Sequence, residues 1–165
     1  MGLETEAEIM SNPLVAGYQH EFLLLTDTKT HEQIVTRAGP KEHYNPLGVI
    51  RNETQKSATG KGNVKLVTTM VPAEKSADFN DKHDTLQGSK VTLKPDLASV
   101  KSSLQNLNNK VDSSQTDYRP QTINSNAYIN TVYQALTGST QPQNDKAPGS
   151  NLLLKLPDDP PLEKK

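Results

Sequence analysis

The hydrophobic pattern of this chain changes once, near Asp96, from strand-like segments to helical spacing. Before that point, compact apolar runs such as 22–26 and 64–71 end at turn residues or at a proline. After it, apolar residues recur every three or four positions, at Leu97, Val100, Leu104, Leu107 and Val111. Strands followed by helices are typical of the α+β class, so we expect a small antiparallel sheet packed on two or three helices.

The first half of the chain predicts a β-hairpin and two later strands. Residues 20–27 and 32–37 are the arms of the hairpin, and 26–30 between them has turn chemistry. The later strands are predicted over 64–71 and 90–94, and each is followed by a proline. These two later strands are expected to form a second segment of the sheet.

The second half predicts two helices with recognisable ends. Asp96 directly follows Pro95 and is a suitable N-cap for the first helix. The second helix is predicted over 125–136, and Gly138 is expected to end it. Residues 41–62 are rich in Gly, Asn, Lys and Pro, which predicts a long loop between the hairpin and the later strands.

A single domain is expected over 14–138, with a polar segment on each side. Residues 1–13 are predicted to be a polar lead, helical through 4–10. Residues 139–165 are predicted to be a Pro/Gln-rich C-terminal segment in which 151–156 adds a short edge strand.

Composition narrows the class of function. The hydrophobic fraction of 32% in 165 residues predicts a thin core. A net charge of −1 with scattered Lys and Arg argues against nucleic-acid binding. No apolar run approaches the ~18 residues of a membrane span, and the lack of cysteine excludes disulfides and thiolate metal sites.

One pair of residues has the chemistry for covalent catalysis. Ser125 lies between Asn124 and Asn126 at a predicted helix start, where free backbone N–H groups favour a developing anion. His20 opens an apolar strand and is a candidate general base. The simpler alternatives are that Asn124 or Ser125 only caps the helix and that His20 is a hydrogen-bonded strand-end histidine.

These segments together resemble the circularly permuted papain-like fold. The resemblance rests on the strand His20-Glu-Phe-Leu-Leu-Leu-Thr-Asp, the return strand ending Arg37-Ala-Gly-Pro, and the late helix start Asn-Ser-Asn-Ala-Tyr128. This group is similar to NlpC-type cell-wall amidases and peptidases, with the histidine strand moved ahead of the nucleophile helix. The resemblance implies His20 as base and Ser125 at the nucleophile position.

The chain departs from that pattern at its nucleophile. Families of this fold place cysteine where Ser125 stands, and a thiol ionises far more easily than a hydroxyl. Three explanations stay open: a natural serine nucleophile, an inactive relative kept for binding, or a cysteine replaced to silence a toxic protein. Gln33 and Thr36 are the candidates to orient the base, and Tyr118 is a candidate oxyanion donor beside Asn124 and Asn126.

A metal site is a weaker alternative. Asp78, Asp81, His83 and Asp84 lie close together in a polar segment and offer oxygen and imidazole ligands, but without an EF-hand pattern. We therefore expect neither a metal nor a cofactor.

The resemblance implies a hydrolase or acyl-transfer domain that acts on an amide, peptide or ester bond. It further implies a peptide, amide or lipid-ester substrate, a cognate immunity protein as partner, and a secreted or delivered bacterial effector or toxin module. Two other classes remain: a non-catalytic binding or immunity-type protein on the same scaffold, and a small structural or coat-associated protein.

Overall fold

The computed structural model describes residues 4–13, 19–40, 65–76, 79, 85–118, 124–139, 141, 144 and 146–156. Five strands precede two α-helices in this part of the chain, which confirms the α+β class. Their bounds are β1 Thr5–Pro13, β2 Gln19–Asp27, β3 Gln33–Pro40, β4 Leu66–Pro72, β5 Thr85–Leu93, α2 Leu97–Ser113 and α3 Ser125–Thr137, with a short 3-10 helix, η2, at Ala73–Lys75. The predicted loop over 41–62 lies outside the described residues.

The strands form one antiparallel sheet in the order β4-β3-β2-β1-β5. The predicted hairpin is present as β2 and β3, and its turn is closed by Asp27. The Asp27 carboxylate accepts hydrogen bonds from the backbone N–H groups of Lys29 and Thr30, both at 2.8 Å. Asp is favoured in turns for this reason, because its side chain bonds the backbone two residues on.

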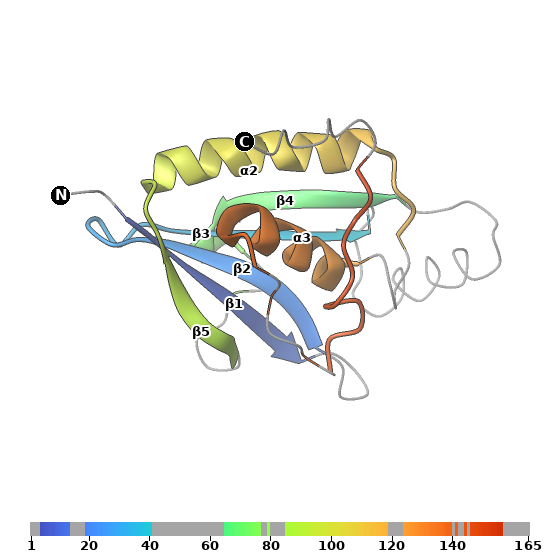
Figure 1. Ribbon diagram of the computed structural model, residues 1–165, viewed down its shortest axis with the longest axis horizontal. Helices are drawn as coiled ribbons and strands as arrows, with labels where there is room; N and C mark the ends of the chain where they lie inside the picture. The colour runs from blue at the N-terminus through green and yellow to red at the C-terminus, as the bar shows by residue number, and fades with distance from the viewer. Residues whose placement is uncertain are drawn as a thin grey trace.

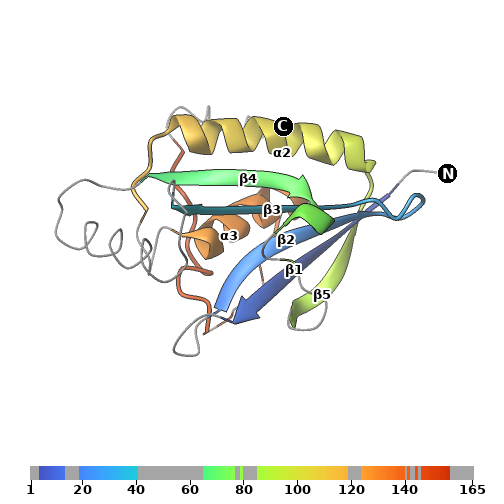
Figure 2. The same cartoon turned by 180° about the vertical axis from the view of Figure 1, so that it is seen from behind.

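The molecule has two layers, with α2 and α3 both on one face of the sheet (Figure 1). We call this the helix face and the opposite one the open face; Figure 2 shows the open face, with η2 at the end of β4. The main core lies between the sheet and the helices. A smaller cluster on the open face contains Phe22, Leu24, Val35 and Ala73. Alternate residues of β2 and β3 therefore enter different cores.

The predicted polar lead over 1–13 is wrong for residues 5–13, which form strand β1. This strand lies between β2 and β5, so it belongs to the domain and is not helical. Ala7 and Ile9 are buried on the helix face, whereas Glu6 and Glu8 alternate with them and lie 3.2 and 3.9 Å from the Lys90 ammonium of β5. Apart from Ile9, the inward residues of β1 are the small side chains of Thr5, Ala7 and Ser11, which give a weak apolar signal in the sequence.

No strand is present over 151–156, contrary to expectation. These residues lie along α3, whose polar side chains replace a neighbouring strand. Asn130 Nδ2 donates to the Leu152 carbonyl at 2.9 Å, and the Leu154 N–H donates to Thr131 Oγ1 at 2.9 Å. Leu154 and Leu156 pack against the main core. The segment therefore packs on a helix, although its apolar residues led to the prediction of a strand.

The helix ends follow the prediction. Asp96 caps α2 by accepting from the Ser99 N–H at 2.8 Å, and α3 ends at Gly138 with a left-handed φ of 75°. The expected apolar stripe of α2 is buried except that Leu107 is half-buried and Asn108 takes a core position. No helix among the described residues has the length and apolarity to cross a bilayer.

Candidate functional site

The start of α3 lies where strands β2 and β3 stop pairing. Their ladder runs from Thr26↔Gln33 to Leu23↔Thr36, and its continuation would bring Glu21 opposite Ala38. The Ser125 hydroxyl occupies that position. It donates to the Glu21 carbonyl at 2.8 Å and accepts from the Ala38 N–H at 3.3 Å. A side chain of α3 therefore joins the two strands where their backbones no longer bond each other.

The Asn126 side chain also bonds backbone groups of β2 that no neighbouring strand pairs. Its Oδ1 accepts from the Glu21 N–H at 2.8 Å, and its Nδ2 donates to the Gln19 carbonyl at 3.2 Å. The Gln19 N–H in turn donates to the Lys146 carbonyl at 2.6 Å. Because buried backbone groups must be paired, the backbone of Gln19 and Glu21 on this side of β2 is satisfied without a strand.

Asn124 fixes the start of the helix. Its Oδ1 accepts from the Ala127 N–H at 3.1 Å, the usual N-cap bond, and its Nδ2 donates to the Pro148 carbonyl at 2.8 Å. Asn126 Nδ2 donates to the same carbonyl at 2.9 Å. Helix α3 contains no charged residue, so this end can be buried against the sheet without leaving an unpaired charge. The Asn-Ser-Asn run is thus a joint between α3, β2 and the C-terminal segment.

The structure places His20 and Ser125 on different sides of the sheet. β1 and β2 pair without irregularity through Asn12↔His20, so side chains alternate between faces along the whole of β2. His20 shares the open face with Phe22 and Leu24, whereas Ser125 approaches from the helix face. The two side chains predicted to act together are not brought to one face.

The candidates for orienting the base also lie apart from His20. Thr36 points to the helix face, where its hydroxyl bonds the Tyr128 hydroxyl at 2.6 Å. Gln33 is at the far end of the hairpin, where Nε2 donates to Thr26 Oγ1 at 3.2 Å. At ~3.3 Å per residue, Thr26 is roughly 20 Å along β2 from His20. Neither Thr36 nor Gln33 is placed to fix the tautomer of His20.

Tyr118, the candidate oxyanion donor, follows an isolated bridge between Lys65 and Asp117 and packs half-buried against the main core.

The candidate metal ligands Asp78, Asp81, His83 and Asp84 lie outside the described residues. Where side chains are described, no three His, Asp or Glu residues gather as a metal site would require. The catalytic roles assigned to Ser125 and His20 remain predictions.

Glu21 is the residue of this site that sequence reasoning missed. It points to the helix face with Leu23 and Leu25, and its exposed fraction is 0%. Burial raises the pKa of the Glu21 carboxyl from 4.5 to about 8, and the Gln141 side chain beside it lowers that pKa in part. A signal was present in the sequence, because Glu21 directly precedes the apolar run 22–25 and shares the period-two face of Leu23 and Leu25.

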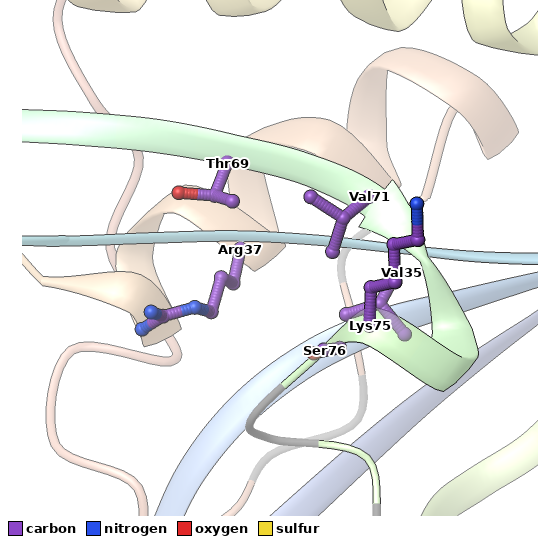
Figure 3. Close-up of a pocket in the computed structure, with 6 residues that line it drawn as sticks. All are labelled: Val35, Arg37, Thr69, Val71, Lys75 and Ser76. Carbon is purple, nitrogen blue, oxygen red and sulfur yellow. The ribbon is translucent and has the colours of Figure 1, made fainter.

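A second candidate site lies on the open face, against β3 and β4. It is a pocket of about 150 Å³ lined by Val35, Arg37, Thr69, Val71, Lys75 and Ser76. Figure 3 shows the Arg37 and Lys75 side chains extending in different directions, with their charged groups well apart. The pocket therefore combines an apolar centre, two hydroxyls and two separated cations. Side chains alternate between the two faces along β3 and β4, and this alternation brings Val35, Arg37, Thr69 and Val71 to the same face. These residues are far apart in the sequence, so no local pattern predicts the pocket.

No protein-family model, no curated protein and no solved structure matches this chain. The site must be interpreted from its own geometry.

Proposed function

We propose that this protein is a non-catalytic binding module whose open-face pocket takes an acidic peptide segment of a protein partner. The observation that carries the proposal is the presence of both Arg37 and Lys75 around one apolar pocket, on a protein whose net charge is −1. Charge complementarity of this kind gives specificity and a fast association rate more than affinity.

The lining residues favour an extended peptide over a single small anion. Val35 and Val71 offer contact for apolar side chains, and Thr69 and Ser76 offer hydroxyls for hydrogen bonds. The two charged groups are separated across the pocket, so they do not converge on one phosphate (Figure 3). In an extended chain, residues two apart lie on the same face about 6.6 Å from each other. Alternating acidic and apolar residues suit this arrangement.

The helix-face site supports the same interpretation. The Ser125 hydroxyl is 3% exposed and already bonds two backbone groups that would otherwise be unpaired. Its removal from those bonds for nucleophilic attack would expose the Glu21 carbonyl and the Ala38 N–H to the cost of unmade hydrogen bonds, about 1–3 kcal/mol for each group. Ser125 is thus better suited to hold the fold than to react.

Fluorescence anisotropy with a labelled peptide of alternating Glu and Val tests the proposal. The peptide should bind the wild-type chain, with an affinity that falls as salt rises, because exposed ion pairs are screened. Lys75→Glu should weaken binding about tenfold, since it replaces attraction by repulsion. Lys101→Glu, a charge reversal at an exposed site on α2, should leave binding unchanged. Equal binding of a Gln/Val peptide, or insensitivity to Lys75→Glu, would contradict the proposal.

Hydrolysis of an amide, peptide or ester bond is the second candidate. Its support is the place of Ser125 as the first residue of α3, next to the capping Asn124, as the papain-like resemblance implies. Ser125→Cys should then react with a small haloacetamide faster than a free thiol amino acid and should hydrolyse model esters, and His20→Ala should abolish both. A thiol at position 125 that stays unreactive in the folded protein would exclude this function.

A further inference from the structure

The Glu21 carboxyl is a buried polar group without a hydrogen-bond donor. It is fully buried, yet no protein group donates to either of its carboxyl oxygens. An ionised carboxylate in this state is among the most costly arrangements a protein interior can contain. Most buried polar groups have a partner, so a carboxyl without a donor calls for an explanation.

The neighbouring Gln141 side chain offers a buried oxygen that also has no hydrogen-bond donor. Gln141 Nε2 has two hydrogens, and it donates to the Ser150 carbonyl at 2.7 Å and to the Asn126 carbonyl at 3.2 Å. With both hydrogens used, only its Oε1 is left for the carboxyl, and that oxygen also lacks a donor. Both residues bond Asn126: its Oδ1 accepts from the Glu21 backbone N–H, and its carbonyl accepts from Gln141 Nε2. A single hydrogen shared by the Glu21 carboxyl and Gln141 Oε1 would satisfy acceptors that otherwise have no donor.

We propose that Glu21 is protonated in the folded protein and donates its hydroxyl hydrogen to Gln141 Oε1, so that this proton latches Gln141 and residues 146–156 onto β2 and α3. The bond would complete the pairing of Gln141, whose N–H already donates to Asn130 Oδ1 at 3.2 Å. Gln141 would then bond β2, α3 and Ser150, and so join all three.

The surroundings of Glu21 favour the neutral acid. The groups that bond its own backbone are the uncharged side chains of Ser125 and Asn126, and its β1 partner is Ser11. The titratable groups on the described parts of the elements around it do not face its carboxyl. Those on the open face are Glu6, Glu8, His20 and Arg37. Asp27 lies at the hairpin turn, Tyr128 bonds Thr36, Tyr133 lies near the other end of α3, and Lys146 and Lys155 are exposed. Burial alone raises the pKa of Glu21, and no neighbouring charge contributes to its shift.

Loss of the proton is expected to loosen the C-terminal segment before the rest of the fold. Ionisation of Glu21 would place its negative charge against the acceptor oxygen of Gln141. The bonds that hold 152–154 go to side chains of α3, and Leu152 and Leu153 are 39% and 50% exposed. The segment is thus attached by the apolar contacts of Leu154 and Leu156 and by a polar network around Gln141. Since the pKa of Glu21 is about 8, the loosening is expected as pH rises through that value.

Two measurements on the full chain test the latch. In ¹³C NMR of the side-chain carboxyls, one glutamate should titrate near pH 8, and this signal should be absent from Glu21→Gln. Amide hydrogen exchange at Gln141 and Leu154, corrected for the intrinsic pH dependence, should accelerate at least tenfold between pH 6.5 and 9.5 in the wild type. Glu21→Gln keeps a donor for Gln141 Oε1 at every pH, so its corrected exchange should not change.

The matched control is Glu74→Gln on η2, an exposed glutamate whose neutralisation should leave the wild-type response intact. Equal acceleration in the wild type and Glu21→Gln would overturn the latch. Should Glu21→Gln fail to fold, the wild-type titration decides alone: a Glu21 carboxyl that titrates near 4.5, as an ion solvated by buried water would, also overturns it.

Discussion

The Ser125 hydroxyl donates to the backbone carbonyl of Glu21 over 2.8 Å, at the place where strand β3 would otherwise provide the partner. A single side chain at the start of α3 thereby ties the helix to two strands that have separated. In sequence the same serine has the setting of a nucleophile. The structural role requires the hydroxyl to stay in its two backbone hydrogen bonds, whereas a nucleophile must leave them. The stability of Ser125 variants distinguishes the two roles.

Ser125→Ala is expected to destabilise the fold by about 2–3 kcal/mol, because it leaves the Glu21 carbonyl and the Ala38 N–H buried without a partner. Urea unfolding followed by circular dichroism measures this as a lower midpoint with an unchanged slope. A residue kept only for catalysis would give no such loss.

Ser102→Ala is the control for that change. Ser102 is exposed in the middle of α2, where alanine is the better helix former, so its midpoint should stay the same or rise slightly. Equal midpoints for the Ser125 and Ser102 variants would show that the strand joint does not depend on the hydroxyl.

Asn126→Asp is expected to cost about 3 kcal/mol or more at pH 7, although it changes only one atom type. The amide donates to the carbonyls of Gln19 and Pro148, and a carboxylate would put a charged acceptor against both. Acidification would restore one donor to the variant. The pKa of the new carboxyl should therefore be raised in the folded state, and the loss of stability should shrink as pH falls.

Asn106→Asp makes the same change at an exposed position of α2 and should alter stability by no more than about 0.5 kcal/mol. Thermal unfolding of both variants at pH 4.5 and pH 7 separates the two cases. A deficit for Asn126→Asp that is equal at both pH values would contradict the paired-carbonyl explanation.

Tyr128→Phe is expected to destabilise the protein by about 1–3 kcal/mol through a ring of three side chains. The Tyr128 hydroxyl donates to Asn108 Oδ1 at 2.5 Å, Asn108 Nδ2 donates to Thr36 Oγ1 at 3.4 Å, and the Thr36 hydroxyl returns to Tyr128 at 2.6 Å. The ring joins α2, α3 and β3. Burial raises the pKa of Tyr128, so its hydroxyl stays protonated and can donate.

The control is Tyr133→Phe on the same helix. Tyr133 is also buried in the main core, but its hydroxyl makes no hydrogen bond among the residues described, so the change should be close to neutral. The difference between the two midpoints in urea isolates the contribution of the ring. A difference near zero would show that Asn108 and Thr36 find other partners.

Local signals in the sequence predicted the elements whose chemistry is local. The hairpin, the Asp96 cap, the helix over 125–137 and its end at Gly138 depend on neighbouring residues, and each is present. β1 was missed because its inward residues include Ala7 and Ser11, which are recognisable as buried only beside β2 and β5. The same held for 151–156, whose apolar residues do not reveal that they pack on a helix.

The site depended on contacts between residues about 100 positions apart, which no local pattern contains. The sequence by itself determined that Asn124, Ser125 and Asn126 begin a helix and that Glu21 lies in a strand, directly before its apolar residues. Only the tertiary structure decided that this helix start fills the gap between β2 and β3, that His20 faces away from it, and that Glu21 meets Gln141. The physical reason is that a buried hydroxyl, amide or carboxyl acquires its role from the partner that satisfies it, and folding selects that partner.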